Sequence, residues 1–96
     1  MEMYKAGWKQ FITLCRETKE EKTLSTLFDL LLTHEEKESI AMRCLIVREL
    51  LQQAQTQREI AQNLQVSIAK ITRGSNELKR MKDAFLVYLK SKLLKS

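Results

Sequence analysis

Three residues in the second half of the chain have types and spacing suited to holding a small charged ligand. Arg73 directly precedes Gly74, and Glu77 follows that glycine by three positions. A guanidinium pairs with a carboxylate, a carboxylate pairs with an ammonium, and glycine lets another group come close to the backbone. A ligand with a carboxylate, an ammonium and a flat apolar body, which is the shape of an aromatic amino acid, would find a partner for each part. Gly74 is equally compatible with the close approach of another helix or of DNA, and it weakens a helix by about 1 kcal/mol relative to alanine.

The sequence contains no arrangement typical of catalysis or of metal binding. It has no Ser, His and acid set, no Gly-rich phosphate loop and no paired carboxylates in an apolar setting. His34 is the only histidine, and Cys15 and Cys44 have neither a second Cys nor a His at ligand spacing. We expect both cysteines to be small buried side chains in a reducing compartment. We predict a protein that is not an enzyme and that uses no metal or cofactor.

The candidate ligand residues fall on the second of two short helices predicted at about residues 56–80. Thr56 and Glu59 have the spacing of a capping box, which predicts a helix that starts at Gln57. Ser67 is a good N-cap for the second helix. Two helices joined by such a short turn form a helix-turn-helix, whose second helix can lie in the DNA major groove.

Positive charge is concentrated in the same half of the chain. Residues 1–55 carry eight Lys and Arg against nine Asp and Glu, a net charge of −1, whereas residues 56–96 carry nine against three, a net charge of +6. General solubility does not explain this segregation, but a polyanionic partner does, because Lys and Arg release the counterions of phosphates. The outward face of the second helix fits such a partner, with Ala69, Thr72, Arg73, Asn76 and Arg80 on it and Lys70 and Lys79 at its edges.

Composition predicts a single all-α domain over residues 1–96. Proline is absent and there are only two glycines, so nothing interrupts long helices and little supplies the turns of a sheet. Six short helices are expected, the other four at about residues 4–20, 24–32, 34–51 and 84–94. Their apolar stripes are wider than a chain of this size can cover, which favours an interlocked homodimer.

Helical spacing assigns an inner face to most of these helices. The apolar segment 24–32 is expected to be buried, and Asp83 is expected to cap the last helix. An inner stripe on the helix from His34 contains Ile40, Arg43, Cys44, Val47, Leu50 and Leu51, and Ala41 and Ile46 widen it. For Arg43, taken alone, we favour a packed stem with the guanidinium in solvent.

No stretch approaches the roughly 18 apolar residues of a membrane span. Residues 1–10 carry charged side chains in place of the apolar run of a signal peptide. We therefore expect a cytoplasmic protein with no membrane partner.

Three segments together resemble the bacterial tryptophan repressor family. They are LLLTHEEKESIAMRCLIVRELL (Leu30 to Leu51), TQREIAQNL and IAKITRGSNELK, and the likeness is dense from about Leu24 to Lys79. The resemblance implies an intertwined homodimer that binds palindromic double-stranded operator DNA, with L-tryptophan as corepressor. Helix-turn-helix docking in successive major grooves is known for this family itself.

The resemblance also assigns site residues. Arg43 and Arg73 would flank the indole, Arg73 would meet the ligand carboxylate, and Gly74 would give the ligand room, which replaces the solvent-directed role of Arg43. The carbonyls of Leu30 and Leu32, with Thr33 nearby, would line the other side, and Glu77 would lie near the ammonium. Arg58 would contact a base directly. Ile68, Ala69 and Thr72 would lie at the groove, and Gln57, Ser75, Asn76 and Lys79 would lie near phosphates.

This chain departs from the family pattern at three positions. Glu77 replaces a common serine, and it would either pair with the ligand ammonium or repel the ligand carboxylate. Ala61 and Leu45 stand where familiar members carry basic residues, which puts operator affinity in question. Two alternatives therefore stay open: a constitutive DNA-binding protein, and a basic helical module that docks an acidic protein.

Overall fold

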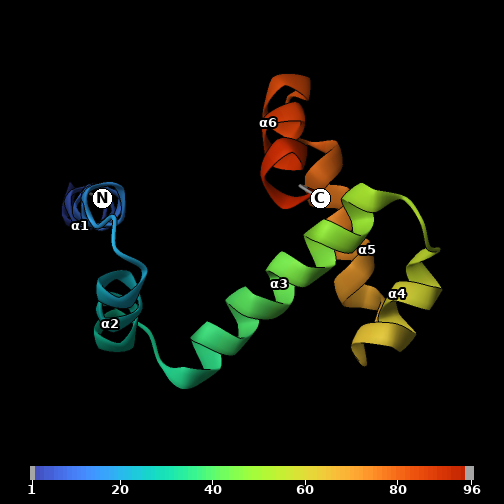
Figure 1. The fold of residues 1–96 in the computed structure, drawn as a ribbon, viewed down its shortest axis with the longest axis horizontal. Helices are drawn as coiled ribbons and strands as arrows, with labels where there is room; N and C mark the ends of the chain where they lie inside the picture. The colour runs from blue at the N-terminus through green and yellow to red at the C-terminus, as the bar shows by residue number, and fades with distance from the viewer. Residues whose placement is uncertain (1, 95–96) are drawn as a thin grey trace. The chain divides into compact units, whose positions relative to one another are not determined.

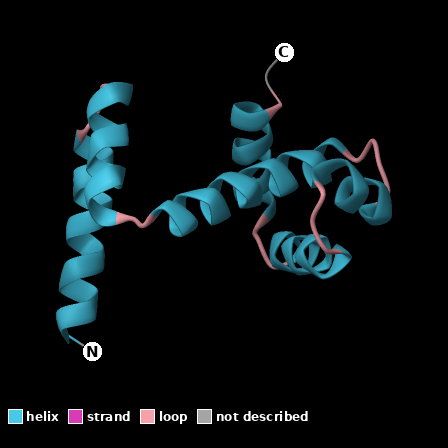
Figure 2. Cartoon of the chain, turned by 90° about the horizontal axis from the view of Figure 1, so that it is seen from below, coloured by secondary structure: helices cyan, strands magenta, loops and turns pink. Residues whose placement is uncertain are grey.

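The computed structural model describes residues 2–94, and every regular element in that range is an α-helix (Figure 1, Figure 2). The helices are α1 (Glu2–Glu17), α2 (Glu21–Leu31), α3 (His34–Gln52), α4 (Gln57–Leu64), α5 (Ile68–Lys79) and α6 (Asp83–Leu93). The all-α prediction and the number of helices are confirmed. The chain forms two compact units, one up to Lys37 and one from Glu38 onward, so α3 begins in the first and continues in the second.

In the first unit, α1 and α2 meet through aromatic rings. The ring centroids of Phe11 and Phe28 lie 6.2 Å apart, and Trp8 lies 5.3 Å from Phe11 on the same helix. The predicted burial of segment 24–32 is wrong for the single chain, because no residue of α2 is buried and Leu30 is 80% exposed. The physical reason is that α1 covers only one side of a helix that is apolar nearly all round.

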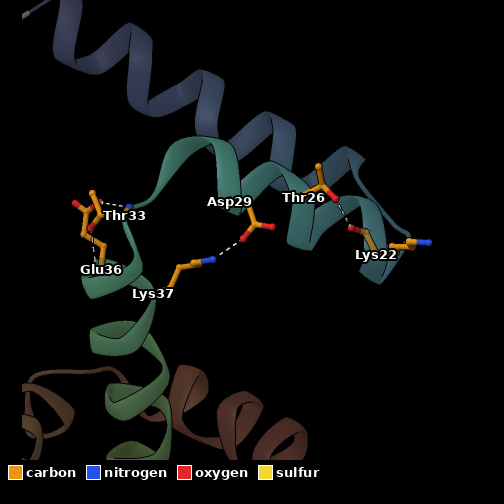
Figure 3. A network of polar contacts seen from close by, with 6 residues as sticks. All are labelled: Lys22, Thr26, Asp29, Thr33, Glu36 and Lys37. Atoms are coloured by element: carbon orange, nitrogen blue, oxygen red, sulfur yellow. Dashed lines mark hydrogen bonds and ion pairs between the residues drawn. The ribbon is translucent and has the colours of Figure 1, made fainter.

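A polar network holds the corner between α2 and α3 (Figure 3). The backbone N–H of Thr33 donates to the Glu36 carboxylate at 2.8 Å, and the N–H of Glu36 donates to the Thr33 hydroxyl at 3.1 Å. These two hydrogen bonds form a capping box, and α3 starts at His34 as expected. Lys37 of α3 also forms an ion pair with Asp29 of α2, and this contact links the two helices.

The second unit has a small apolar core. Its buried cluster contains Ile46 of α3, Ile60 and Ala61 of α4, and Ile71 of α5, and Leu51 of α3 is buried outside that cluster. Ala61 of α4 is buried in the same cluster as Ile71 of α5. Partly buried neighbours complete the cluster, namely Met42, Leu50, Leu64 and Val66.

The inner stripe predicted for α3 is partly wrong. Ile40 and Cys44 are exposed, and so the expectation of a buried Cys44 is also wrong, whereas Cys15 is partly buried. The buried residues of α3 are Leu51, which belongs to the predicted stripe, and Ile46, which the pattern places at its edge. Apolar residues occur on more than one side of α3, and α4 and α5 cover only the side that carries Ile46.

The helix-turn-helix has the predicted caps. The Thr56 hydroxyl accepts from the N–H of Glu59 at 3.1 Å, the Glu59 carboxylate accepts from the N–H of Thr56 at 2.8 Å, and Ser67 caps α5. The intervening turn closes α4 at Gln65, which has a left-handed backbone with φ 58°. The N–H of Val66 reaches back to the carbonyl of Ala61 at 3.0 Å, as in a Schellman motif.

Replacing Gln65 with glycine should stabilise the protein by about 0.5–1 kcal/mol, because glycine adopts the left-handed conformation without the side-chain clash. Urea denaturation at one protein concentration measures the change. Gln62→Gly is the matched control inside α4, where the same substitution should destabilise by about 1 kcal/mol. Equal losses in both variants would show that the turn gains nothing from a glycine.

The last helix begins one residue earlier than predicted. Asp83 is the first residue of α6, and Lys82 occupies the cap position without a side-chain hydrogen bond. The aspartate therefore acts through its charge in the first turn, where the helix dipole favours an anion. None of the described helices is long and apolar enough to cross a membrane.

Candidate functional site

A cavity of about 400 Å³ opens within the second unit, between α3, α5 and α6. Most of its lining is apolar, and a volume of this size is typical of sites for small molecules. The apolar lining residues are Met42, Ile46, Val47, Leu78, Met81, Phe85 and Leu89. The cavity therefore has the size and the apolar walls needed for a flat ring system.

The charged groups of this cavity come from two helices. Arg43 projects from α3, and Lys70, Arg73 and Glu77 belong to α5. Three cations and one carboxylate suit a ligand that carries both signs of charge. Because the cations outnumber the carboxylate, the negative group of such a ligand would find more partners than its positive group. Of the residues predicted for the ligand, Arg43, Arg73, Gly74 and Glu77 are brought together here.

Gly74 has a packing role as well as a place in the cavity wall. A Cβ at this position would lie 3.1 Å from Cγ2 of Ile46 and 3.4 Å from Cδ1 of Leu50. The first distance is closer than ordinary contact, so the absence of a side chain lets α3 approach α5. The sequence left three explanations for this glycine: a ligand, DNA or another helix close to the backbone. The described residues show the third, because Ile46 and Leu50 of α3 lie next to Gly74.

The other three predicted ligand residues belong to the first unit. Leu30 lies in the last turn of α2, where helix carbonyls have no intrahelical partner, and Leu32 and Thr33 form the corner that follows. The backbone N–H of Thr33 is held by the capping box with Glu36 (Figure 3).

The eight residues predicted for DNA lie in the first turn of α4 and along α5. Gln57 and Ser75 are partly buried, whereas the remaining six are exposed: Arg58, Ile68, Ala69, Thr72, Asn76 and Lys79. The hydroxyl of Thr72 donates to Oε1 of Gln57 at 2.9 Å. This hydrogen bond links the start of α4 to the middle of α5, so the two helices present one continuous surface.

Some cavity residues were not singled out by sequence reasoning. Lys70 was placed at the edge of the outward face, and α6 was not expected at the site at all. Phe85 and Leu89 of α6 lie four residues apart, and this helical spacing was the available signal. Phe85 is 45% exposed because the cavity that it lines is open.

Comparison with known proteins identifies the family. The family model described as Trp repressor protein matches residues 6–93. The chain belongs to the Trp repressor family. It is 46% identical to a Trp operon repressor homolog of Chlamydia trachomatis over 88 residues, which cover 92% of this chain and 94% of that protein. A homolog from Chlamydia caviae is 49% identical over 88% of this chain and 84% of its own length, and one from Vibrio vulnificus is 46% identical over 79% and 74%.

As a Trp repressor family member, the protein is a DNA-binding regulator of transcription and not an enzyme. The resemblance predicted from the sequence is thereby confirmed. The matched region includes both the helix-turn-helix and the whole cavity of the second unit. These two features share α5.

Proposed function

We propose that the protein is a repressor that binds palindromic operator DNA as a homodimer, with L-tryptophan as its corepressor. The observation that carries this proposal is the placement of Arg73 and Glu77 in an apolar cavity on the same helix that carries the DNA-facing residues. A ligand in the cavity would press on α5 from one side while DNA contacts it from the other. Corepressor binding and operator binding are therefore coupled through the position of one helix.

In this proposal the indole lies against the apolar wall, with Arg43 and Arg73 on either side. The ligand carboxylate pairs with Arg73, because a guanidinium offers two parallel N–H groups to a carboxylate. Glu77 lies nearest the ammonium. We propose that the carbonyls of Leu30 and Leu32, with Thr33 nearby, make the remaining contacts to the ligand. The last carbonyls of a helix have no intrahelical partner and can therefore accept hydrogen bonds from a ligand.

The exposed apolar surface supports a homodimer. Large apolar side chains are exposed on several helices, namely Trp8, Ile12, Leu30, Leu31, Ile40, Val87 and Tyr88. A folded chain rarely leaves so many such groups in water unless a partner covers them. We propose that a second copy does so, and that residues 1–96 act as a single DNA-binding domain within that dimer.

The test is a titration of operator DNA with and without L-tryptophan at one salt concentration. Salt must stay constant because it alone changes the affinity for DNA by orders of magnitude. We expect tryptophan to tighten operator binding, and linkage then requires the operator to tighten tryptophan binding by the same factor. Equal operator affinity in both conditions would instead indicate a constitutive DNA-binding protein.

Arg58 provides a test of the DNA-facing surface. It is exposed in the first turn of α4 and is proposed to read a base edge. Arg58→Ala should weaken operator binding by about 1–3 kcal/mol and weaken binding to random DNA much less. Lys79→Ala is the control, because loss of a phosphate contact should weaken both duplexes similarly and lower the salt dependence. An equal loss on both duplexes for Arg58→Ala would show that this residue contacts only phosphate.

A further inference from the structure

We propose that the turn between α5 and α6 extends the DNA-contacting surface, with Arg80 and Lys82 binding phosphates beside the groove that the helix-turn-helix reads. This basic turn consists of Lys79, Arg80, Met81 and Lys82. Lys79 already belongs to the proposed DNA surface, whereas Arg80 and Lys82 have no role in it and do not line the cavity. The inference rests on the operator binding of the proposed function and not on its response to tryptophan.

Arg80 continues the side of α5 that is proposed to face DNA. It follows Asn76 by four residues and Ala69 by eleven, which is close to one and to three helical turns, so the three positions lie on one side of the helix. The backbone of Arg80 is still helical, with φ −86° and ψ −9°, and its N–H donates to the carbonyls of Glu77 and Leu78. The row of DNA-facing positions therefore continues through the C-terminal end of α5 to Arg80.

The length of α5 brings its C-terminal end to the edge of the groove. The helix has 12 residues, and a rise of about 1.5 Å per residue makes it about 18 Å long. The major groove of B-DNA is only about 12 Å wide. In helix-turn-helix docking, the N-terminal residues of the second helix contact base edges. The opposite end of α5 then projects past the bases and reaches the phosphates that border the groove.

The charge of the basic turn fits such phosphates. Lys79, Arg80 and Lys82 are all exposed, and only Asp83 opposes them within the five positions from Lys79 to Asp83, which gives a net charge of +2 from three cations and one acid. Exposed cations gain affinity for DNA by releasing the counterions of phosphates. Because the turn is continuous with the DNA-facing side of α5, operator phosphates are a better match for this charge than an acidic protein.

The contact between Arg80 and Glu77 leaves the guanidinium able to bind a phosphate. Nη1 of Arg80 donates to Oε1 of Glu77 at 3.4 Å, and the Arg80 side chain is 76% exposed. An exposed ion pair of this kind is weak, and a guanidinium has five N–H groups. Within the part of the chain that the structure describes, no carboxylate forms an ion pair with Lys79 or Lys82. All three cations are therefore available to DNA.

The salt dependence of DNA binding tests the inference. The double variant Arg80→Gln/Lys82→Gln removes two charges at positions that belong neither to the core cluster nor to the cavity. Each lost phosphate contact reduces the slope of log affinity against log salt concentration by about 0.9, so two contacts in each protomer of the proposed dimer amount to about 3.6. At low salt the affinity should fall at least about tenfold, on operator and random DNA alike, because phosphates carry no sequence information.

Three further variants separate a phosphate contact from other effects. Arg80→Lys/Lys82→Arg keeps both charges and should keep the wild-type slope. Lys19→Gln/Lys22→Gln is the matched control, because it removes two charges from exposed positions of the first unit and should leave the slope unchanged. Lys82→Gln alone should have half the effect of the double variant, and it keeps the ion pair between Arg80 and Glu77.

The outcomes distinguish this inference from the proposed function, provided that each titration is carried out with and without L-tryptophan. A wild-type slope in the double variant would overturn the inference and leave the basic turn to solvent or to an acidic protein. A loss confined to operator DNA would also overturn it, because a phosphate contact does not depend on base sequence. An operator affinity that does not respond to tryptophan in the wild-type protein would overturn the corepressor function and leave the expected change in slope intact. A wild-type protein that does not bind DNA would overturn both.

Discussion

Arg73→Leu is expected to abolish the response to tryptophan while leaving a folded protein. Arg73 lines the cavity from α5, and it is exposed, so its removal leaves no gap in the core. In the proposed complex its guanidinium pairs with the ligand carboxylate. Removing one partner of such a pair costs about 2–5 kcal/mol, which lowers ligand affinity by a factor of about 30 or more. Tryptophan at ordinary concentrations would then no longer change operator binding.

The measurement is the ratio of operator affinities with and without tryptophan. A ratio is needed because Arg73→Leu also removes one positive charge, which weakens DNA binding in both conditions. Arg48→Leu is the control, since it removes the same charge from α3 at a position that does not line the cavity. The control should keep the full response. A normal response in Arg73→Leu would remove this residue from the ligand site and leave Arg43 as the remaining guanidinium.

The helix starts were predictable because their signals are local. The pairs Thr33 with Glu36 and Thr56 with Glu59 form both hydrogen bonds of a capping box, and each helix begins where the spacing indicates. A cap depends on residues three positions apart, so no distant contact decides it. The start of α6 was misplaced because it has no such local signal: Lys82 occupies the N-cap position and forms no side-chain hydrogen bond there.

The buried faces were harder to predict because packing decides them. On α3, the residues Ile40, Cys44 and Ile46 are all apolar, and only the position of α4 and α5 determines that Ile46 is buried. Periodicity identifies apolar faces but does not choose between two of them. The exposed positions of α2 show the same limit, since an apolar pattern that indicates burial does not say whether the helices of the same chain provide the cover.

The sequence predicted only some of the residues that line the cavity. Arg73, Gly74 and Glu77 are neighbours on one helix, so their spacing was enough to group them. Arg43 was known only as an unusual residue in an apolar stripe, and its place opposite α5 follows from the contact that Gly74 allows between the two helices. The wall from α6 depends on packing between distant segments, which no local spacing encodes. Resemblance to the family supplied the link that the residues alone did not.

The second large effect is expected in the core of the DNA-binding unit. Ile71 is completely buried, with 0% exposure, and it packs with Ile46 and Ile60. Ile71→Ala should lower the free energy of unfolding by about 2–5 kcal/mol, because it removes apolar contacts and leaves a cavity. In a core this small, that loss is a large share of the total stability. Ile71→Val should lower the stability by only about 1 kcal/mol.

Ile68 offers a matched comparison on the same helix. It is 46% exposed and lies three residues earlier, on the surface proposed for DNA. Ile68→Ala should change stability by no more than about 0.5 kcal/mol, since surface substitutions rarely do more, yet it should weaken operator binding. Urea denaturation at one protein concentration, combined with operator titration, measures both quantities. The concentration is held constant because association would stabilise the proposed dimer. If both alanine variants lost the same stability, Ile71 would not be the centre of the core. If they instead differ as expected, α5 has one face that holds the unit together and another that is free to contact DNA.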